Sequence, residues 1–214
     1  MIVYDLTHTI SENMPVYPGT ETPKLKSACT LEANGFRETL LQMYSHTGTH
    51  IDAPAHMFKN GASLDSFDGG QFVGIAAVID CTELGENGRI DLSFIDRNRA
   101  LADKAEFLLF RTGWDKFWGG AAYFEDFPCI TGEVADYIAA SGKKGVGLDT
   151  VSIDPVSSTD FENHRKILGQ NKTVIIENLC GLDKLSAGLF GLIAAPLKFT
   201  GADGAPARVF VVEV

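Results

Sequence analysis

Long apolar runs and basic clusters are missing from this sequence, and each absence excludes a class of protein. Its 18 Lys and Arg stand against 28 Asp and Glu, a net charge of −10 that repels phosphate backbones and anionic lipids. The most apolar windows, FVGIAAVIDC and LFGLIAAPLKF, are too short to cross a bilayer. We therefore expect neither a nucleic-acid partner nor a membrane partner.

Cysteine is scarce and scattered. The four cysteines stand at positions 29, 81, 129 and 180 and form no Cys-x-x-Cys pair. The N-terminal MIVYDLTHTI has no basic segment before an apolar run, so we expect no secretory signal. Together these features are typical of reduced thiols in a cytoplasm, and they argue against a structural zinc site of the cysteine-rich type.

No internal repeat, low-complexity tract or Ser/Gly-rich linker divides the chain, so we expect a single domain over residues 1–214. Strands alternating with helices predict an α/β fold, and strand pairs at both ends favour a mixed sheet. Asp91 or Ser93 is expected to cap the first helix, Thr131 the second, and Gly142 to end the second. Strand-like segments are 2–6, 35–45, 72–81, 105–113, 144–153, 173–179 and two in 195–214 around a turn at 203–204; helix-like segments are 91–104, 131–142 and 160–171.

Histidine is also scarce, yet three of the five histidines lie in HTGTHIDAPAH, residues 46–56. His46, His50, Asp52 and His56 all have even numbers, so in an extended segment their side chains project to one face. A helix is not expected here because Pro54 stands in the middle of the stretch.

Spacing then separates these candidate ligands. His50 and Asp52 would lie about 7 Å apart at Cα, close enough to reach one ion, whereas His46 and His50 would lie about 13 Å apart if fully extended. Gly48 stands between the two histidines, where positive φ allows a bend at low cost. The stretch therefore predicts a bent metal site, and its ligand types suit zinc, manganese or iron. The alternative is a polar turn with histidines bonded to backbone. Because no cysteine lies within this stretch, an open, catalytic metal site is favoured over a closed structural one.

The same stretch matches His-x-Gly-Thr-His-x-Asp-x-Pro-x-His in full, and it resembles the signature of the cyclase family of metal-dependent hydrolases, which includes bacterial kynurenine formamidase and isatin hydrolase. Other family landmarks follow in order: DLTHTI, MPVYPG, RTGW, GVGLDTVSID, ENL and GADGAPARV. The resemblance implies a swivelling β/β/α fold, a homodimer or larger homo-oligomer, and zinc, with two ions per subunit, or manganese. By the order of the motifs it assigns His46, His50, Asp52 and Glu177 to one metal, Asp52, His164 and Glu177 to a second, and the general acid and base to His56.

The residues themselves support these distant assignments unequally. Glu177 ends the apolar strand TVIIE, where burying a carboxylate is costly without a cation, although a solvent-exposed strand end is an equal alternative. His164 lies on a polar helix face, where a solvated histidine is the ordinary interpretation. Asp149 and Asp154 either orient ligand histidines or cap strand ends. We expect His8 to be structural or at a pocket rim.

The implied reaction is hydrolysis of a small amide, formamide or lactam by metal-activated water, with His56 carrying the proton. Tyr17 stands where the resemblance implies a substrate-contacting tryptophan, and it can still stack on an aryl ring. Trp114 and Trp118 add an aromatic wall or fill core. Three hypotheses follow: an arylformamidase acting on N-formylkynurenine, a related hydrolase of another small cyclic amide such as isatin, and a metal-binding protein without catalysis.

Overall fold

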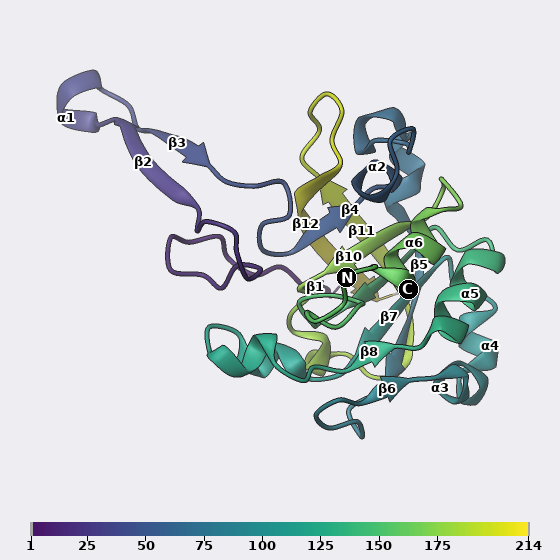
Figure 1. Ribbon diagram of the computed structural model, residues 1–214. Coiled ribbons are helices and arrows are strands. Elements are labelled where there is room, and N and C mark those ends of the chain that lie inside the picture. Colours follow the sequence, from purple (N-terminus) through teal and green to yellow (C-terminus); the bar gives the residue numbers. More distant parts are fainter. Residues whose placement is uncertain (1, 214) are drawn as a thin grey trace.

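A closed sheet forms the centre of the structure, a computed structural model that describes residues 2–213 (Figure 1). The strand order is β1-β12-β11-β5-β7-β9-β10-β4, and β4 also pairs with β12, so seven strands from β12 round to β4 close into a barrel. The strands are β1 (Val3–Asp5), β4 (His50–Asp52), β5 (Val73–Asp80), β7 (Phe107–Arg111), β9 (Gly145–Leu148), β10 (Val174–Glu177), β11 (Gly188–Pro196) and β12 (Gly204–Glu213).

The barrel is mixed, which confirms the predicted α/β class. Strands β5, β7, β9 and β10 run parallel, while β4, β11 and β12 pair antiparallel with their neighbours. Successive residues of β7 alternate between two cores: Phe107 and Leu109 face the barrel interior with Ile51 and Ile176, while Leu108 packs outward against helices. Both faces are buried, which explains the unbroken apolar runs of these strands.

Four helices cover the outer face of the parallel strands: α3 (Leu92–Arg97), α4 (Arg99–Ala102), α5 (Gly132–Ala140) and α6 (Glu162–Leu168). Asp91 caps α3 and Thr131 caps α5, as predicted, with Gly142 at φ +69° just past its end. The single helix expected over 91–104 is wrong, because Asn98 leaves helical geometry and divides it. The longest helix in residues 2–213, α5, has nine residues, too few to cross a membrane.

The C-terminal tail differs from the sequence prediction, because β11 already begins at Gly188 and Gly204 belongs to β12. The turn between the two strands therefore lies at 197–203.

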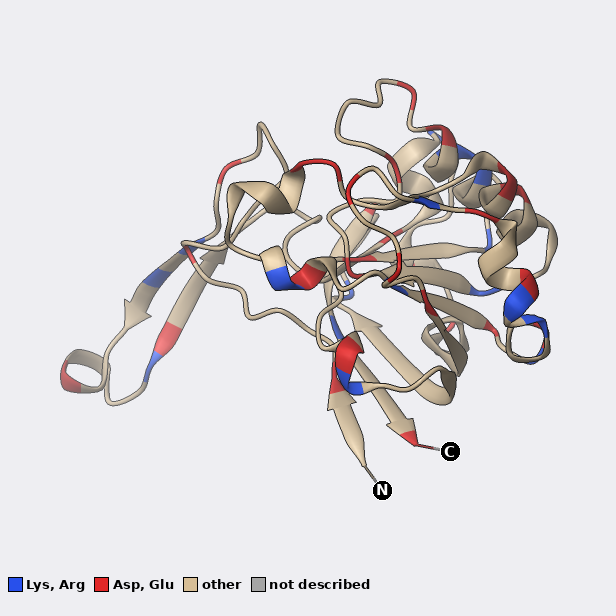
Figure 2. Cartoon of the chain, turned by 90° about the horizontal axis from the view of Figure 1, so that it is seen from below, with Lys and Arg blue, Asp and Glu red and all other residues tan. Residues whose placement is uncertain are grey.

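The remaining elements are short. Strands β2 (Lys24–Cys29) and β3 (Glu38–Gln42), joined by α1 (Leu31–Asn34), form a hairpin that projects from the barrel (Figures 1 and 2). The others are α2 (Pro54–Met57), β6 (Arg89–Ile90), β8 (Cys129–Ile130) and the 3₁₀ turns Leu64–Ser66, Gly69–Phe72, Trp114–Phe117, Ala121–Phe124 and Leu182–Lys184.

Candidate functional site

The first part of the site is the short strand β4 with the bend before it. His50 and Asp52 share one face of β4, as their even spacing predicts, and His50 Nε2 lies 3.2 Å from Asp52 Oδ1. Gly48 has φ +65° and turns the chain, which brings His46 Nδ1 to 2.6 Å from the same carboxylate oxygen. The bend predicted at Gly48 is therefore confirmed.

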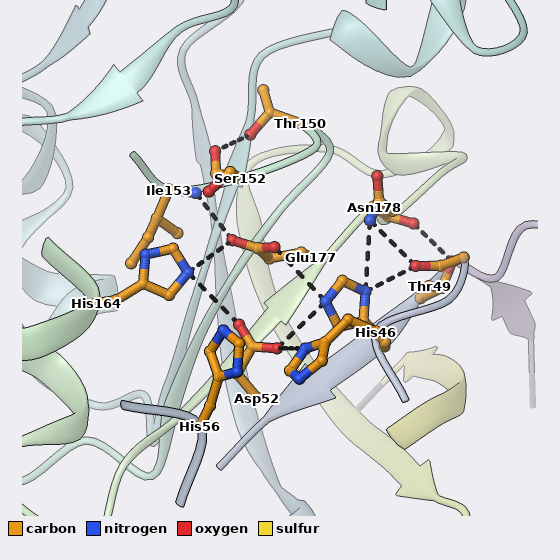
Figure 3. A network of polar contacts seen from close by, with 12 residues as sticks. His46, Thr49, Asp52, His56, Thr150, Ser152, Ile153, His164, Glu177 and Asn178 are labelled. Atoms are coloured by element: carbon orange, nitrogen blue, oxygen red, sulfur yellow. Dashed lines mark hydrogen bonds and ion pairs between the residues drawn. The ribbon is translucent and has the colours of Figure 1, made fainter. Parts of the chain in front are cut away.

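Strand pairing and helix α6 supply the distant residues. Glu177 lies directly opposite His50 in the antiparallel pairing of β10 with β4, and its Oε2 is 3.6 Å from His50 Nε2. His164 projects from α6, with Nε2 at 3.3 Å from Glu177 Oε1 and 3.6 Å from Asp52 Oδ2. Segments more than a hundred residues apart in the chain thus meet at one point (Figure 3).

Each of three histidines is held by one ring nitrogen and directs the other at the carboxylates of the site. His50 Nδ1 donates to the Gly48 carbonyl at 2.8 Å, so Nε2 is left to face Asp52 and Glu177. In the same way, His164 Nδ1 contacts Asp154 Oδ2 at 2.7 Å, and His46 Nε2 contacts Asp203 Oδ2 at 3.1 Å. Anchoring one imidazole nitrogen on an oxygen acceptor is the usual arrangement around a metal-binding histidine.

Charge and burial favour a cation between these groups. Asp52 and Glu177 are 1% and 5% exposed, and across residues 2–213 no Lys or Arg lies within 4.0 Å of either carboxylate. Burial lowers the pKa of His46, but the Asp52 carboxylate outweighs it, with help from Asp203, and raises that pKa to about 10. The cluster therefore stabilises added positive charge.

The donor atoms have the spacing that an ion requires. Those of His46, His50 and Asp52 all lie within 4.8 Å of one another. Those of Asp52, His164 and Glu177 form a second such group. Asp52 belongs to both, so the residues present fit a two-ion centre with imidazole and carboxylate ligands.

His56 reaches the site by a different local structure from the one predicted. Instead of continuing an extended strand, the chain forms α2, and Pro54 occupies its first turn, where proline needs no hydrogen-bond donor. The His56 ring lies 4.0 Å from the His46 ring between centroids, and its Nδ1 is 3.9 Å from Asp203 Oδ2. Its side chain is about one-third exposed, at the edge of the cluster.

A cavity of about 340 Å³ opens onto these groups. Tyr17 lines it, together with Tyr44, Tyr123, Phe124 and Phe161, so part of its wall is aromatic. Within residues 2–213 none of the side chains lining it is Lys or Arg; the titratable groups nearest the metal-binding cluster are His46, His50, Asp52, His56, His164, Glu177 and Asp203.

Four of the remaining sequence candidates lie outside this cavity. Trp114 is buried in a small aromatic core, Trp118 packs at its edge, and His8 stacks on Trp118 with ring centroids 3.7 Å apart. Asp149 accepts hydrogen bonds from the backbone of Thr112 and Gly113 and contacts no histidine among the described residues. These side chains support the fold around the site.

Asp154 differs from Asp149, because it binds His164 through both the ring and the backbone amide. Sequence reasoning assigned no role in the site to Asp203, Gly204 or Asn178. The pair Asp203-Gly204 was interpreted as a turn within the family landmark GADGAPARV, without a role in the site, yet Gly204 lies directly beside the His46 ring. Only the pairing of β12 with β4 reveals this contact.

Comparison with known proteins agrees with this geometry. The family described as "Putative cyclase" matches residues 4–155. The kynurenine formamidase of Bacillus cytotoxicus is 31% identical over 97% of this chain and 95% of its own, and that of Sphingopyxis alaskensis is 30% identical over 99% and 98%.

Solved structures are also similar to this chain. Isatin hydrolase A from Ralstonia solanacearum superposes with a TM-score of 0.86 at 26% identity, covering 99% of this chain and 92% of its own. A predicted metal-dependent hydrolase from Bacillus stearothermophilus superposes with a TM-score of 0.80 at 32% identity, over 98% and 97%. The closed mixed sheet, the complete histidine motif and these matches lead to one conclusion: the chain belongs to the cyclase family of metal-dependent hydrolases.

Proposed function

We propose that this protein is a metal-dependent hydrolase that cleaves the C–N bond of a small amide or formamide, as an arylformamidase does. One observation carries the proposal: three anchored histidines direct their other ring nitrogens at two buried carboxylates that no Lys or Arg in residues 2–213 neutralises. The names of the relatives, a kynurenine formamidase and an isatin hydrolase, support the same class of reaction.

Two divalent cations are proposed to share the carboxylates, zinc in the first place and manganese as the alternative. A bound cation lowers the pKa of a water molecule toward neutrality and polarises a substrate carbonyl. We assign one ion to His46, His50, Asp52 and Glu177, and the second to Asp52, His164 and Glu177.

His56 is assigned the proton transfer. Hydrolysis places the hydroxyl of water on the carbonyl carbon and a proton on the leaving nitrogen, so one group must take the proton and release it. Burial lowers the pKa of His56 from its usual value, which keeps the ring neutral and able to accept a proton at pH 7. Its place beside the cavity supports this role.

The residues that line the cavity indicate which substrates it can bind. Tyr17 and its aromatic neighbours suit an aryl ring, and about 340 Å³ suits a small molecule. A second candidate, an uncharged cyclic amide such as isatin, is favoured by one observation: within the described chain no Lys or Arg lines the cavity to pair with the α-carboxylate of N-formylkynurenine.

The test is elemental analysis of protein purified without added metal, followed by turnover assays with N-formylkynurenine, isatin and formanilide. We expect bound zinc or manganese and hydrolysis of at least one substrate. Turnover of isatin alone selects the second candidate. A protein that binds neither metal and stays inert after both are supplied contradicts the proposal.

Gly204 leaves room for the His46 ring, and this predicts the effect of adding one methyl group. A Cβ at Gly204 would lie 2.8 Å from both ring nitrogens of His46, closer than such atoms approach, so the ring must move. We expect Gly204→Ala to weaken Zn²⁺ or Mn²⁺ binding by about 10–100-fold, the loss typical of a misoriented metal ligand. Isothermal titration calorimetry measures it.

Gly85→Ala is the matched control, because a Cβ there meets nothing within 4 Å and the backbone is not left-handed. This variant should bind metal as the wild type does. Unchanged metal affinity in Gly204→Ala would show that His46 is not a ligand in the position described.

We also propose that the protein is a homodimer or larger homo-oligomer, because the projecting hairpin exposes apolar side chains. Every residue of β3 is exposed. Four of the eleven exposed large hydrophobic residues in the described chain lie in this hairpin, and a fifth, Tyr44, follows it closely; the four are Leu31, Phe36, Leu40 and Leu41. Such a concentration is unusual on a monomer and marks an interaction surface.

The hairpin predicts a charge-sensitive assembly. Leu40→Glu should shift the protein toward monomer in size-exclusion chromatography with light scattering, because it places a charge in the buried contact. Leu197→Glu is the control: Leu40 and Leu197 are 57% and 56% exposed, but Leu197 lies outside the hairpin. A Leu40→Glu variant that assembles as the wild type does argues against this interface.

We also propose that residues 1–214 form one domain, which is supported by the pairing of β1 with β12 from opposite ends of the chain. The protein is cytoplasmic, which is supported by the four cysteines, all of them free thiols.

A further inference from the structure

Asn178 has an unusual backbone conformation directly after Glu177. Its φ is +57°, in the left-handed region that side chains other than glycine rarely adopt. Within residues 2–213 five non-glycine residues have positive φ, and Asn178 is the only one of them that is buried. A strained and buried residue next to a functional side chain calls for an explanation in terms of function.

Both polar atoms of the Asn178 side chain are used. Its Nδ2 donates to the Gly48 carbonyl at 3.1 Å, and its Oδ1 accepts from the Tyr123 hydroxyl at 2.8 Å. The Gly48 carbonyl settles which way the amide faces, because a carbonyl oxygen can only accept and therefore takes the –NH₂ end. The Oδ1 end is then left to accept from the Tyr123 hydroxyl.

The side chain is not needed to hold its own backbone. The Asn178 amide donates to the Thr150 carbonyl at 3.0 Å, and its carbonyl accepts from Thr49 Oγ1 at 2.6 Å. What the side chain adds is the link to Gly48, and that same carbonyl accepts the His50 Nδ1 proton at 2.8 Å. Two donors therefore fix one peptide group, and its orientation decides where His50 Nε2 points.

We propose that Asn178 is a positioning residue: held in place by Tyr123, it holds the Gly48 peptide so that His50 presents Nε2 to the metal centre. The left-handed conformation brings the amide within reach of Gly48 directly after the strand end that carries Glu177. The inference rests on the proposed metal site. Binding of Mn²⁺ and Zn²⁺ by the wild type is therefore measured first, and a wild type that binds neither overturns the site itself.

Asn178→Gly is the sharpest variant, because glycine keeps the left-handed backbone without strain and removes only the side chain. We expect the melting temperature of the metal-free protein to fall modestly, because the buried Tyr123 hydroxyl loses its partner while the backbone strain at position 178 is relieved. The affinity for Mn²⁺ should fall by about 10–100-fold in calorimetry, and excess Mn²⁺ should restore turnover. Asn87→Gly is the matched control, because Asn87 has the same φ of +57° but lies on the surface. It should leave Mn²⁺ affinity and turnover unchanged.

Tyr123→Phe tests the second half of the proposal. Without the hydroxyl, Asn178 Oδ1 loses its hydrogen-bond partner and the side chain is held less firmly. Mn²⁺ binding should therefore weaken, and the double variant should bind no more weakly than Asn178→Gly alone. Additive losses would overturn the link between the two residues. Wild-type affinity in Asn178→Gly, with turnover lost even in excess Mn²⁺, would overturn the positioning role, because Asn178 would then act on the substrate.

Discussion

Asp52→Asn is expected to remove bound metal and abolish turnover, because Asp52 contributes to both donor groups. Its Oδ1 faces His46 and His50, and its Oδ2 faces His164. Burial raises the pKa of Asp52, but His46 and His50 outweigh it and hold that pKa well below its usual range, so the group is ionised.

Asparagine keeps the shape of this group but lacks its charge and one of its two acceptor oxygens. Changing a residue that only orients a ligand weakens metal binding by about 10–100-fold, and removing a shared ligand should cost more. The measurements are metal content after dialysis, metal affinity by calorimetry, and turnover.

Asp149→Asn is the matched control for Asp52→Asn. Both carboxylates are almost fully buried, but Asp149 contacts backbone amides and no described histidine. This variant should lose stability and keep its metal. If Asp52→Asn kept full metal content and turnover, the two-ion assignment would be wrong.

His56→Ala is expected to lower kcat by about 10²–10⁴-fold, the contribution typical of a general acid or base, while metal content stays at the wild-type level. The separation follows from the geometry. His56 lines the cavity beside His46, but it is absent from both donor groups that contain Asp52. Turnover and metal analysis on the same preparation test the two halves of this prediction.

Imidazole supplied in solution should restore part of the turnover of His56→Ala, since it can occupy the space left at the open edge of the cavity. Asp52→Asn should not respond, which makes it the control for non-specific effects of the buffer. Wild-type turnover in His56→Ala would show that another group carries the proton.

Local spacing predicted the parts of the site that lie within a few residues of one another. Alternation along an extended strand places His50 and Asp52 on one face, and Gly48 provides the bend that returns His46. The same reasoning failed at Pro54, where a proline taken to oppose a helix instead begins one. A proline at the first position of a helix and one in its interior give the same local signal until the flanking backbone is known.

The distant residues were identified by resemblance to the family, and only the fold explains them. Glu177 meets His50 through the register of β10 against β4, which the burial of apolar neighbours such as Ile51 and Ile176 sets. Asp203 and Asn178 join the site by the same kind of pairing and carry no signal in their immediate neighbours.

By itself, therefore, the sequence determined the α/β class, the even spacing of HTGTHIDAPAH and the bend at Gly48, because each depends on backbone geometry over a few residues. The tertiary structure alone decided which outer groups hold the histidines: Asp154, Asp203 and the Gly48 carbonyl. Those contacts depend on barrel closure, in which strands from distant parts of the chain find their register by burying apolar side chains inside and outside the sheet.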